Sequence, residues 1–154
     1  MSPSEKGDLV YLLNILQYIG KIEKFTEKIK DAETFFLQDD QIVFDATLHL
    51  LLNIGENAKK IKSTTRQEYS NIDWQKIINF RNIIVHEYTG IDHIVVYNIV
   101  TTELKLLKQK IENIIIDRLN KGIFDMETIA VCKNNRYYQF VDFEEINVPT
   151  ASCR

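Results

Sequence analysis

Apolar residues recur every three or four positions along most of the chain, which is the spacing of the buried side of an amphipathic helix. The first such stretch covers residues 9–29, with lysines and glutamates between the apolar positions. Asp8 precedes it and is expected to cap its first turn, because a short side-chain oxygen there can accept a bond from an orphan backbone N–H. A second helix is expected at residues 41–61, capped by Asp39 or Asp40.

Two further helices are expected after the polar stretch at residues 63–71, which itself has room for one short helical turn. Asp73 is a suitable N-cap for a third helix at residues 74–86. Gly90 is expected to stop that helix, since glycine adopts the left-handed backbone conformation at little cost. A fourth long helix is expected at residues 92–119.

The pattern changes after Gly122, which is expected to end the fourth helix. Residues 128–133 and 136–143 are rich in β-branched and aromatic side chains, and Asn134 and Asn135 between them tolerate the positive φ angles of a tight turn. This pattern predicts a β-hairpin. An isolated hairpin is only marginally stable in water, so it should pack on the helices or on a partner.

The expected fold class is mostly α, an up-and-down four-helix bundle in residues 1–122 with a C-terminal extension in residues 123–154. A chain of 154 residues with 45% hydrophobic side chains suits one domain, and its five glycines and two prolines favour helices. Four aromatic side chains of the extension either complete the core of the bundle or form a contact surface for a partner. These are Tyr137, Tyr138, Phe140 and Phe143.

Net charge, cysteine content and the absence of targeting signals limit the possible ligands and the cellular compartment of the protein. A net charge of -3 gives no global basic field, so any nucleic acid is expected to bind locally. Cys132 and Cys153 are expected to be reduced thiols. The polar start of the chain is unlike a signal peptide, and no apolar run approaches the roughly 20 residues of a membrane span. The protein is therefore expected in the cytoplasm.

Arg81 and His86 are the residues best suited to chemistry. Arginine presents a permanently charged planar fork that matches phosphate, and the ordinary pKa of histidine, about 6.5, allows proton transfer in both directions near neutrality. In RNA the 2′-hydroxyl is an internal nucleophile. A base that removes its proton and a cation that stabilises the crowded phosphorus can then suffice without a metal.

The spacing of the pair sets a geometric problem. On an ideal helix Arg81 and His86 are separated by about 140° and by about 7.5 Å along the axis, so they do not share a face. Either the helix loosens towards Gly90, or a second subunit completes the pocket across a two-fold axis. A purely structural alternative is that His86 caps the helix and Arg81 pairs with Glu87 or Asp92.

Between Phe35 and about Ile115 the chain resembles the HEPN toxins of the HepT-like group, which are four-helix bundles encoded beside a minimal nucleotidyltransferase antitoxin. The resemblance is carried by Phe44-Asp45-Ala46, Ile54-Gly55-Glu56-Asn57-Ala58, Ile72-Asp73-Trp74, Arg81-Asn82-Ile83-Ile84-Val85-His86-Glu87-Tyr88 and Gly90-Ile91-Asp92. An arginine and a histidine at this spacing are a weak signal alone, but within this frame they are specific.

The resemblance implies a role for each matching residue. Arg81 would contact the scissile phosphate, and His86 would act as acid or base. Asn82 fills the polar position after the arginine and is expected to orient the site. Tyr88 matches a tyrosine that the partner nucleotidyltransferase modifies with AMP in this group, and an added phosphate should oppose RNA binding. Family members form homodimers, which would complete the pocket.

Three other side chains give weaker signals. Glu56 either orients Arg81 or is a packing and surface feature of its helix. His49 and His93 are minor candidates for a catalytic role. No compact group of histidines, cysteines or carboxylates has the spacing of metal ligands, so neither a metal nor another cofactor is expected.

The sequence therefore predicts a metal-independent toxin ribonuclease that cleaves transfer or messenger RNA through the 2′-hydroxyl. A cognate nucleotidyltransferase antitoxin would neutralise it. The main alternative is a non-catalytic dimeric module that binds nucleotide or protein beside the same nucleotidyltransferase. A structural helical adaptor is a third possibility, which predicts neither toxicity nor modification of Tyr88.

Overall fold

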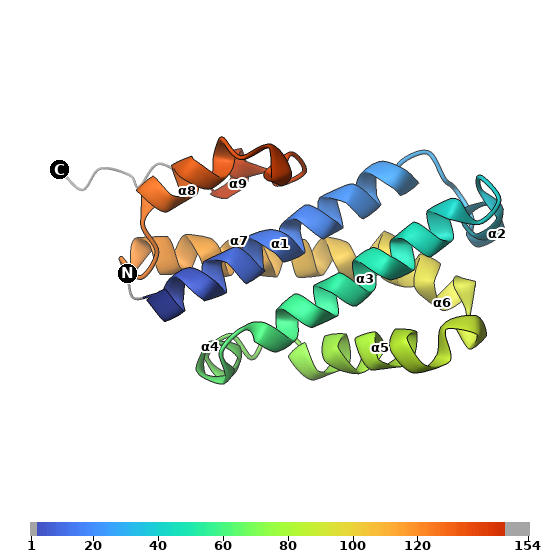
Figure 1. Cartoon of the computed structure of the whole chain (residues 1–154), viewed down its shortest axis with the longest axis horizontal. Coiled ribbons are helices and arrows are strands. Elements are labelled where there is room, and N and C mark those ends of the chain that lie inside the picture. Colours follow the sequence, from blue (N-terminus) through green and yellow to red (C-terminus); the bar gives the residue numbers. More distant parts are fainter. Residues whose placement is uncertain (1–2, 147–154) are drawn as a thin grey trace.

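The computed structural model of the protein describes residues 3–146, with side chains from Gly7 onward, and this part of the chain is helical and contains no strand (Figure 1). The mostly α fold class is therefore confirmed. The long helices are α1 (Pro3–Thr26), α3 (Ile42–Lys60), α5 (Trp74–Glu87) and α7 (Leu104–Asn120). The shorter elements are α2 (Ala32–Leu37), α4 (Ser63–Glu68), η1 (Tyr88–Gly90), α6 (His93–Asn98), the π turn η2 (Ile99–Glu103), α8 (Met126–Lys133), η3 (Arg136–Tyr138) and α9 (Phe143–Ile146).

The four long helices enclose one continuous apolar core. α1 packs against α3 and α7, and α3 packs against α5 on its other side. Leu12, Ile19, Leu48 and Ile111 are among the side chains that are fully buried where these helices meet. This arrangement leaves α5 at one edge of the bundle, where only part of its surface is covered.

Several expected helix ends are present, but Gly90 does not act as predicted. The carboxylates of Asp73 and Asp92 accept backbone bonds from Lys76 (3.0 Å) and Ile94 (2.8 Å), as N-caps do. Gly122 follows the end of α7 as predicted, and its φ of 70° is left-handed. Gly90 has no positive φ, because α5 passes into the 3-10 turn η1 instead of ending at a left-handed residue.

The prediction that Asp39 or Asp40 caps α3 is wrong. No side chain makes a capping hydrogen bond there, and the N-cap residue is Gln41. Asp39, Asp40 and Gln41 instead have φ angles of 49°, 53° and 70°, so three consecutive residues are left-handed. Asparagine and aspartate tolerate this region better than most residues, but each such residue still carries a local energetic cost.

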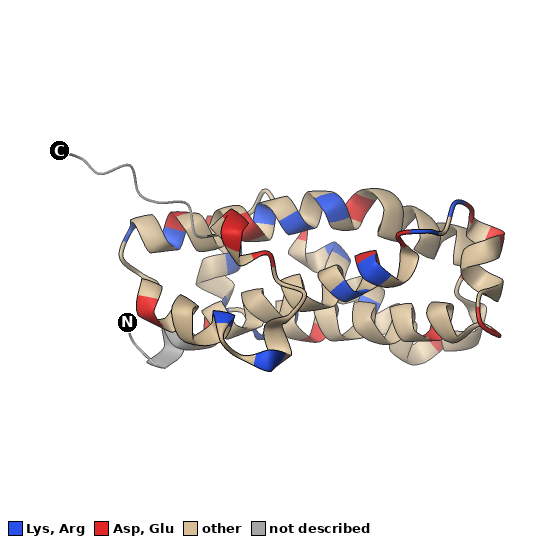
Figure 2. Ribbon diagram, turned by 90° about the horizontal axis from the view of Figure 1, so that it is seen from above, with Lys and Arg blue, Asp and Glu red and all other residues tan. Residues whose placement is uncertain are grey.

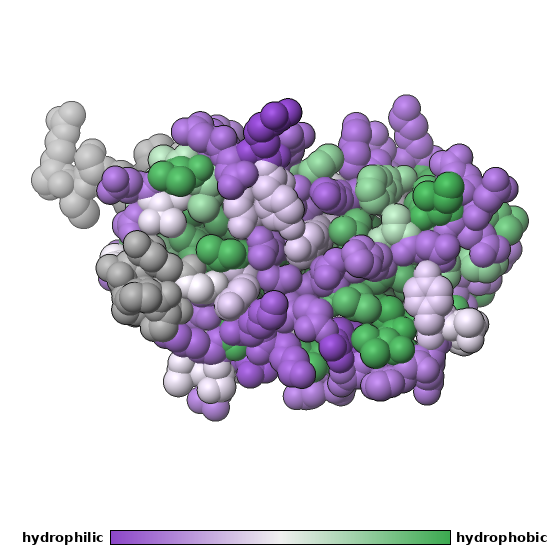
Figure 3. Space-filling view, viewed as in Figure 1, coloured by the Kyte–Doolittle hydropathy of each residue, from purple (hydrophilic) through white to green (hydrophobic). Residues whose placement is uncertain are grey.

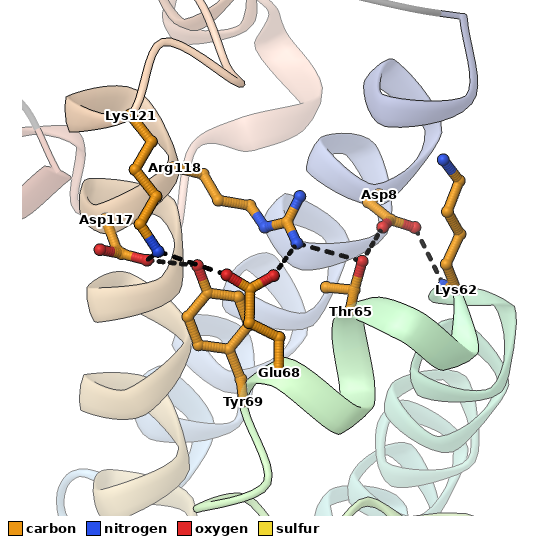
Figure 4. Close-up of polar contacts among 8 residues, drawn as sticks. All are labelled: Asp8, Lys62, Thr65, Glu68, Tyr69, Asp117, Arg118 and Lys121. Carbon is orange, nitrogen blue, oxygen red and sulfur yellow. Dashed lines mark hydrogen bonds and ion pairs between the residues drawn. The ribbon is translucent and has the colours of Figure 1, made fainter.

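The prediction that Asp8 caps α1 is also wrong. α1 begins before Asp8, and the buried Asp8 carboxylate accepts hydrogen bonds from the Lys62 backbone N–H (3.1 Å) and the Thr65 hydroxyl (2.7 Å). It therefore joins α1 to the start of α4, which follows it by more than fifty residues. The Arg118 guanidinium extends the network to Glu68 (2.8 Å), so one end of the bundle is joined by polar contacts between α1, α4 and α7 (Figure 4).

Asp8→Ala is expected to lower the free energy of unfolding by about 1–3 kcal/mol, because the Thr65 hydroxyl and the Lys62 N–H lose their acceptor in a buried place. Asp8→Asn, which keeps one acceptor oxygen, is the matched control and should lose less. Urea denaturation followed by circular dichroism measures both. Equal losses in the two variants would show that the charge, and not the hydrogen bonds, holds this end together.

The predicted C-terminal β-hairpin is wrong, since residues 126–146 form α8, η3 and α9. Asp125 Oδ1 accepts the backbone N–H of Thr128 (2.7 Å) and starts a helix in place of a strand. Asn134 and Asn135 both have a φ of -81°, so neither supplies the positive φ of a hairpin turn. β-branched residues favour strands only where a neighbouring strand and a half-buried surface are available.

The extension packs along α1 as a separate layer, on the side of the bundle away from α5 (Figure 1). A Cβ at Gly20 would lie 2.2 Å from the backbone oxygen of Phe140, so only glycine permits this approach. The Phe140 N–H donates to Gln17 (2.9 Å), and the Tyr138 hydroxyl donates to Asn14 (2.8 Å). Tyr138 and Phe143 are buried and complete the core of this chain, whereas Tyr137 is 45% exposed.

One buried carboxyl group lies under this layer. Glu112 of α7 is only 8% exposed, and burial raises the pKa of its carboxyl above the ordinary value. Glu145 and Asp142 of the extension and Glu23 of α1 raise this pKa further, whereas Lys108 lowers it. A raised carboxyl pKa means that the folded protein holds the Glu112 proton more tightly than the unfolded chain does.

Glu112→Gln is expected to stabilise the protein at neutral pH. In the native protein the stability supplied by the neutral carboxyl is complete at low pH and is lost as the pH rises through the raised pKa. Glutamine does not ionise, so the stability of the variant should match that of the native protein at about pH 4 and exceed it at about pH 8. Urea midpoints across this range test the sign, and a difference independent of pH would contradict it.

Charged residues of both signs are interspersed along the helices (Figure 2). This distribution agrees with the net charge of -3. Hydrophobic side chains also reach the surface where α3 and α5 run side by side (Figure 3). No helix in the described residues is long and apolar enough to span a lipid bilayer.

Candidate active site

The candidate site lies where α3 and α5 run antiparallel in close contact. A Cβ at Gly55 of α3 would stand 2.3 Å from the Cβ of Arg81 on α5, so the two helices approach closely only because position 55 has no side chain. Arg81 is therefore fixed at its base by the packing of the helices. Its side chain leaves this contact towards the flank on which Glu56 lies.

The Arg81 guanidinium is oriented by two side chains. Its Nε donates to Oε1 of Glu56, its Nη2 forms an ion pair with the same oxygen, and its Nη1 donates to Oδ1 of Asn82 (2.9 Å). The side chains of Arg81 and Glu56 are 22% and 29% exposed, so the pair is partly desolvated but reachable. An arginine has five N–H donors, and this arrangement leaves donors of Nη1 and Nη2 available for an anion.

Arg81 thus pairs with Glu56 on another helix, and not with Glu87 or Asp92 as the structural alternative required. The expectation that Glu56 contacts and orients Arg81 has the geometry it needs. Its role in catalysis, and that of Asn82, stays a prediction.

His86 is exposed and, within the described residues, has no hydrogen-bond or ion-pair partner. α5 stays α-helical through Glu87, and the 3-10 turn begins only at Tyr88. The helix therefore loosens after His86, and the proposed loosening that would swing His86 onto the face of Arg81 does not occur.

The conformation of the Arg81 side chain nevertheless brings its charged end nearer to the side of α5 on which His86 lies. Asn82 and His86 are one turn apart, within about 40° of each other around α5. Because the guanidinium reaches over to Asn82, its charged end lies towards the same flank of the helix as His86. One flank of α5 thus carries a fixed cation, an amide and an unpaired imidazole.

Tyr88 is held by a residue that the sequence analysis did not assign. Its hydroxyl donates to Oδ1 of Asp45 (2.9 Å), the first-turn acidic residue of α3. Burial, this hydrogen bond and the Asp45 charge raise the pKa of the Tyr88 phenol above its ordinary value. The ring is still 47% exposed, so a second molecule can reach it. Sequence spacing gave no sign of this contact, because it depends on how α3 and α5 align.

The two remaining histidines have different surroundings. His93 stacks on Phe36, with ring centroids 4.6 Å apart, and its Nε2 lies 2.5 Å from a carboxylate oxygen of Glu33. It therefore joins α6 to α2, which explains its presence without catalysis. His49 is exposed on α3, between Asp45 and Glu56. Within the described chain, no three His, Cys, Asp or Glu side chains are grouped as metal ligands.

A four-helix bundle with an oriented arginine and a free histidine on one edge helix defines a HEPN-type domain. The model of the family described as "Ribonuclease HepT-like" matches residues 15–114. The chain belongs to this HepT-like ribonuclease family, which confirms the resemblance noted from the sequence. Ribonuclease chemistry is therefore what the α3–α5 site has to explain.

Individual relatives agree with the family. "Putative RNase MJ1380" of Methanocaldococcus jannaschii is 29% identical over 109 residues, which cover 71% of this chain and 97% of that protein. "Probable ribonuclease HepT" of Thermococcus cleftensis is 32% identical over 104 residues, or 68% of this chain and 92% of that protein. No solved structure matches the chain. The family match contains α3 and α5 but stops before the C-terminal extension.

Proposed function

We propose that this protein is the toxin of a toxin–antitoxin pair and cleaves RNA without a metal, by attack of the 2′-hydroxyl on the adjacent phosphorus. The observation that carries the proposal is the α5 flank. There Glu56 and Asn82 hold the Arg81 guanidinium with donors to spare, and the unpaired His86 lies one turn away. A fixed cation and a free imidazole are the groups that this reaction requires.

The chemistry balances without an external reagent. A base removes the 2′-hydroxyl proton, the 2′-oxygen forms a bond to phosphorus, and the bond from phosphorus to the 5′-oxygen breaks. An acid gives a proton to the departing 5′-oxygen, which leaves a 2′,3′-cyclic phosphate. Arg81 binds the non-bridging oxygens, where negative charge grows in the transition state. Pre-orientation by Glu56 and Asn82 lowers the reorganisation needed at that moment.

A second copy of the chain is the proposed occupant of a groove beside the site. The groove has a volume of about 740 Å³ and lies between α3, α5 and the α6–α7 segment. Ile83, Val95 and Leu106 are 44%, 50% and 55% exposed on it. Ile83 is one turn from His86 on α5, so a chain that covers Ile83 would come next to the imidazole.

The charges around this groove suit a symmetric contact. Lys76 and Lys110 balance Asp73 and Glu103, and Lys76 is paired with Glu103 at 3.1 Å. A patch with equal numbers of both signs can face itself across a two-fold axis, as homodimers require. Light scattering should give the mass of a dimer for the native protein and of a monomer for Ile83→Asp. A native protein of monomeric mass would contradict this part of the proposal.

The antitoxin is proposed to be a nucleotidyltransferase that transfers AMP to Tyr88. In that step the phenol oxygen bonds to the α-phosphorus of ATP, pyrophosphate leaves, and the phenol proton goes to a base. Tyr88 is exposed and lies on the same helical segment as Arg81. A phosphate attached there would compete for the guanidinium and add bulk beside it, so RNA binding should weaken.

The proposal is tested with purified protein and RNA in the presence of EDTA. Cleavage to a cyclic phosphate is expected, and a 2′-deoxy substitution at the cleaved position should block it. Arg81→Lys keeps the charge but loses the planar fork, and should cleave more slowly than the native protein. Cleavage of the 2′-deoxy substrate, or complete loss of activity with EDTA that added Mg²⁺ restores, would overturn the mechanism.

The pairing is tested separately. Expression of the native chain alone should arrest growth, and co-expression with a nucleotidyltransferase encoded beside it should relieve the arrest. Mass spectrometry should then find AMP on Tyr88. A neutralised complex with unmodified Tyr88 would contradict the modification and leave steric cover as the mechanism of inhibition.

A further inference from the structure

Cleavage through the 2′-hydroxyl needs two proton transfers, one from the nucleophile and one to the leaving group. The Arg81–His86 segment supplies one imidazole within a protomer. The question is whether the same protomer holds a second group that exchanges protons near neutrality. Histidine is the side chain whose ordinary pKa suits this task, and the chain contains three: His49, His86 and His93.

His49 lies on the flank of α3 that faces the site. On an ideal helix Asp45, His49 and Glu56 fall within an arc of about 40°. Asp45 binds Tyr88 at the start of η1, and Glu56 binds Arg81 of α5. Two cross-helix contacts, one on each side of His49 along the helix, thus identify the flank on which His49 stands.

The alignment of the helices places His49 near His86. α3 and α5 are antiparallel, with Asp45 opposite Tyr88 and Gly55 opposite Arg81. His49 lies between Asp45 and Gly55 in sequence, so it is opposite the segment between Arg81 and Tyr88. That segment contains Asn82 and His86.

No packing role accounts for His49. It is exposed, and within the described residues it has no hydrogen-bond, ion-pair or ring contact. His93 differs, because it stacks on Phe36 and binds Glu33. Of the three histidines, His49 and His86 are therefore the two without a partner among the described residues, and they lie on the flanks of α3 and α5 that carry the Glu56–Arg81 pair.

We propose that His49 is a second catalytic residue of the ribonuclease site, and that it performs the proton transfer that His86 does not. The proposal rests on the ribonuclease function above. One of the two histidines, as a neutral imidazole, takes the proton of the 2′-hydroxyl as the 2′-oxygen bonds to phosphorus. The other histidine, as an imidazolium, gives its proton to the 5′-oxygen as the bond between that oxygen and phosphorus breaks. The two histidines end in exchanged protonation states and return through water.

The first test is the pH dependence of RNA cleavage by His49→Ala and His49→Gln. Both variants should lose activity by about 10²- to 10⁴-fold, the usual contribution of a general acid or base. The bell-shaped profile expected of the native protein should lose one limb in each variant. His93→Gln, which alters an imidazole outside the site, is the control and should keep both limbs. Native-like rates, or a full bell of reduced height, in the His49 variants would overturn the proposal.

The second test uses RNA in which sulfur replaces the bridging 5′-oxygen at the cleaved position. A thiolate leaves readily without a proton, so the variant that lacks the acid should recover and the variant that lacks the base should not. Recovery in only one of His49→Ala and His86→Ala supports the division of roles. An equal response of the two variants contradicts it.

The outcomes separate this proposal from the one on which it rests. If the native protein does not cleave RNA, the proposed function fails. If it cleaves RNA and only the His86 variant is impaired, the ribonuclease assignment stands and the role of His49 falls.

Discussion

His86→Ala is expected to lower the rate of RNA cleavage by about 10²- to 10⁴-fold and to abolish growth arrest. The side chain is exposed and, among the described residues, has no partner. Its removal should therefore change the free energy of unfolding by no more than about 0.5 kcal/mol. Cleavage rates on a labelled RNA, together with urea denaturation, measure the two quantities.

Glu87→Ala is the matched control, since Glu87 is the exposed neighbour of His86 at the end of α5. It should retain cleavage within a few-fold. A His86→Ala protein that is folded and still cleaves RNA at the native rate would remove His86 from the mechanism. A His86→Ala protein that fails to fold would contradict the expectation that the His86 side chain does not stabilise the fold.

Gly55→Ala is expected to impair the site and the fold together. The added methyl group would stand 2.3 Å from Cβ of Arg81 and 3.3 Å from the backbone oxygen of Ile77, so α3 and α5 must move apart. Overpacking of this kind costs about 1–3 kcal/mol, of which the better helix propensity of alanine returns about 1 kcal/mol. A displacement of Arg81 by about 1 Å should lower kcat/KM by about 10²-fold.

Gly7→Ala offers the comparison. Gly7 is also helical, but a Cβ there would meet only Tyr11, at an ordinary 3.8 Å. This variant should keep native activity and be no less stable, because alanine favours the helix. Native kcat/KM in Gly55→Ala would show that Arg81 does not need its present position.

The long helices were predictable because each carries a repeated apolar stripe, and the caps Asp73 and Asp92 were predictable because their role is local. The errors occurred where a distant contact overrides the local signal. Asp8 has the chemistry of an N-cap, but it binds Lys62 and Thr65 at the start of α4 and does not cap its own helix. The β-branched residues of the extension have strand propensity, but the chain offers no neighbouring strand, and α1 offers a helix surface to pack against.

The candidate site shows the same division. Arg81 and His86 stand out by residue type and spacing, and the partnership of Arg81 with Glu56 was one of two expectations for that glutamate. The contact between Tyr88 and Asp45 could not be read from the sequence, since the residues lie 43 positions apart and meet only through the alignment of α3 with α5. The same alignment of α3 with α5 makes His49 a stronger candidate for a catalytic role than His93.

The layer formed by α8, η3 and α9 also has a consequence for how a long polynucleotide can lie on the molecule. This layer covers α1 on the side away from α5, and its acidic residues Asp142, Glu144 and Glu145 are exposed. A strand that crossed α1 would meet added bulk and negative charge. A strand that follows the α3–α5 flank would avoid this layer, and towards α4 it would pass Lys59 and Lys60 at the end of α3. We therefore expect the extension to favour an RNA path along α3 and α5 over one across α1.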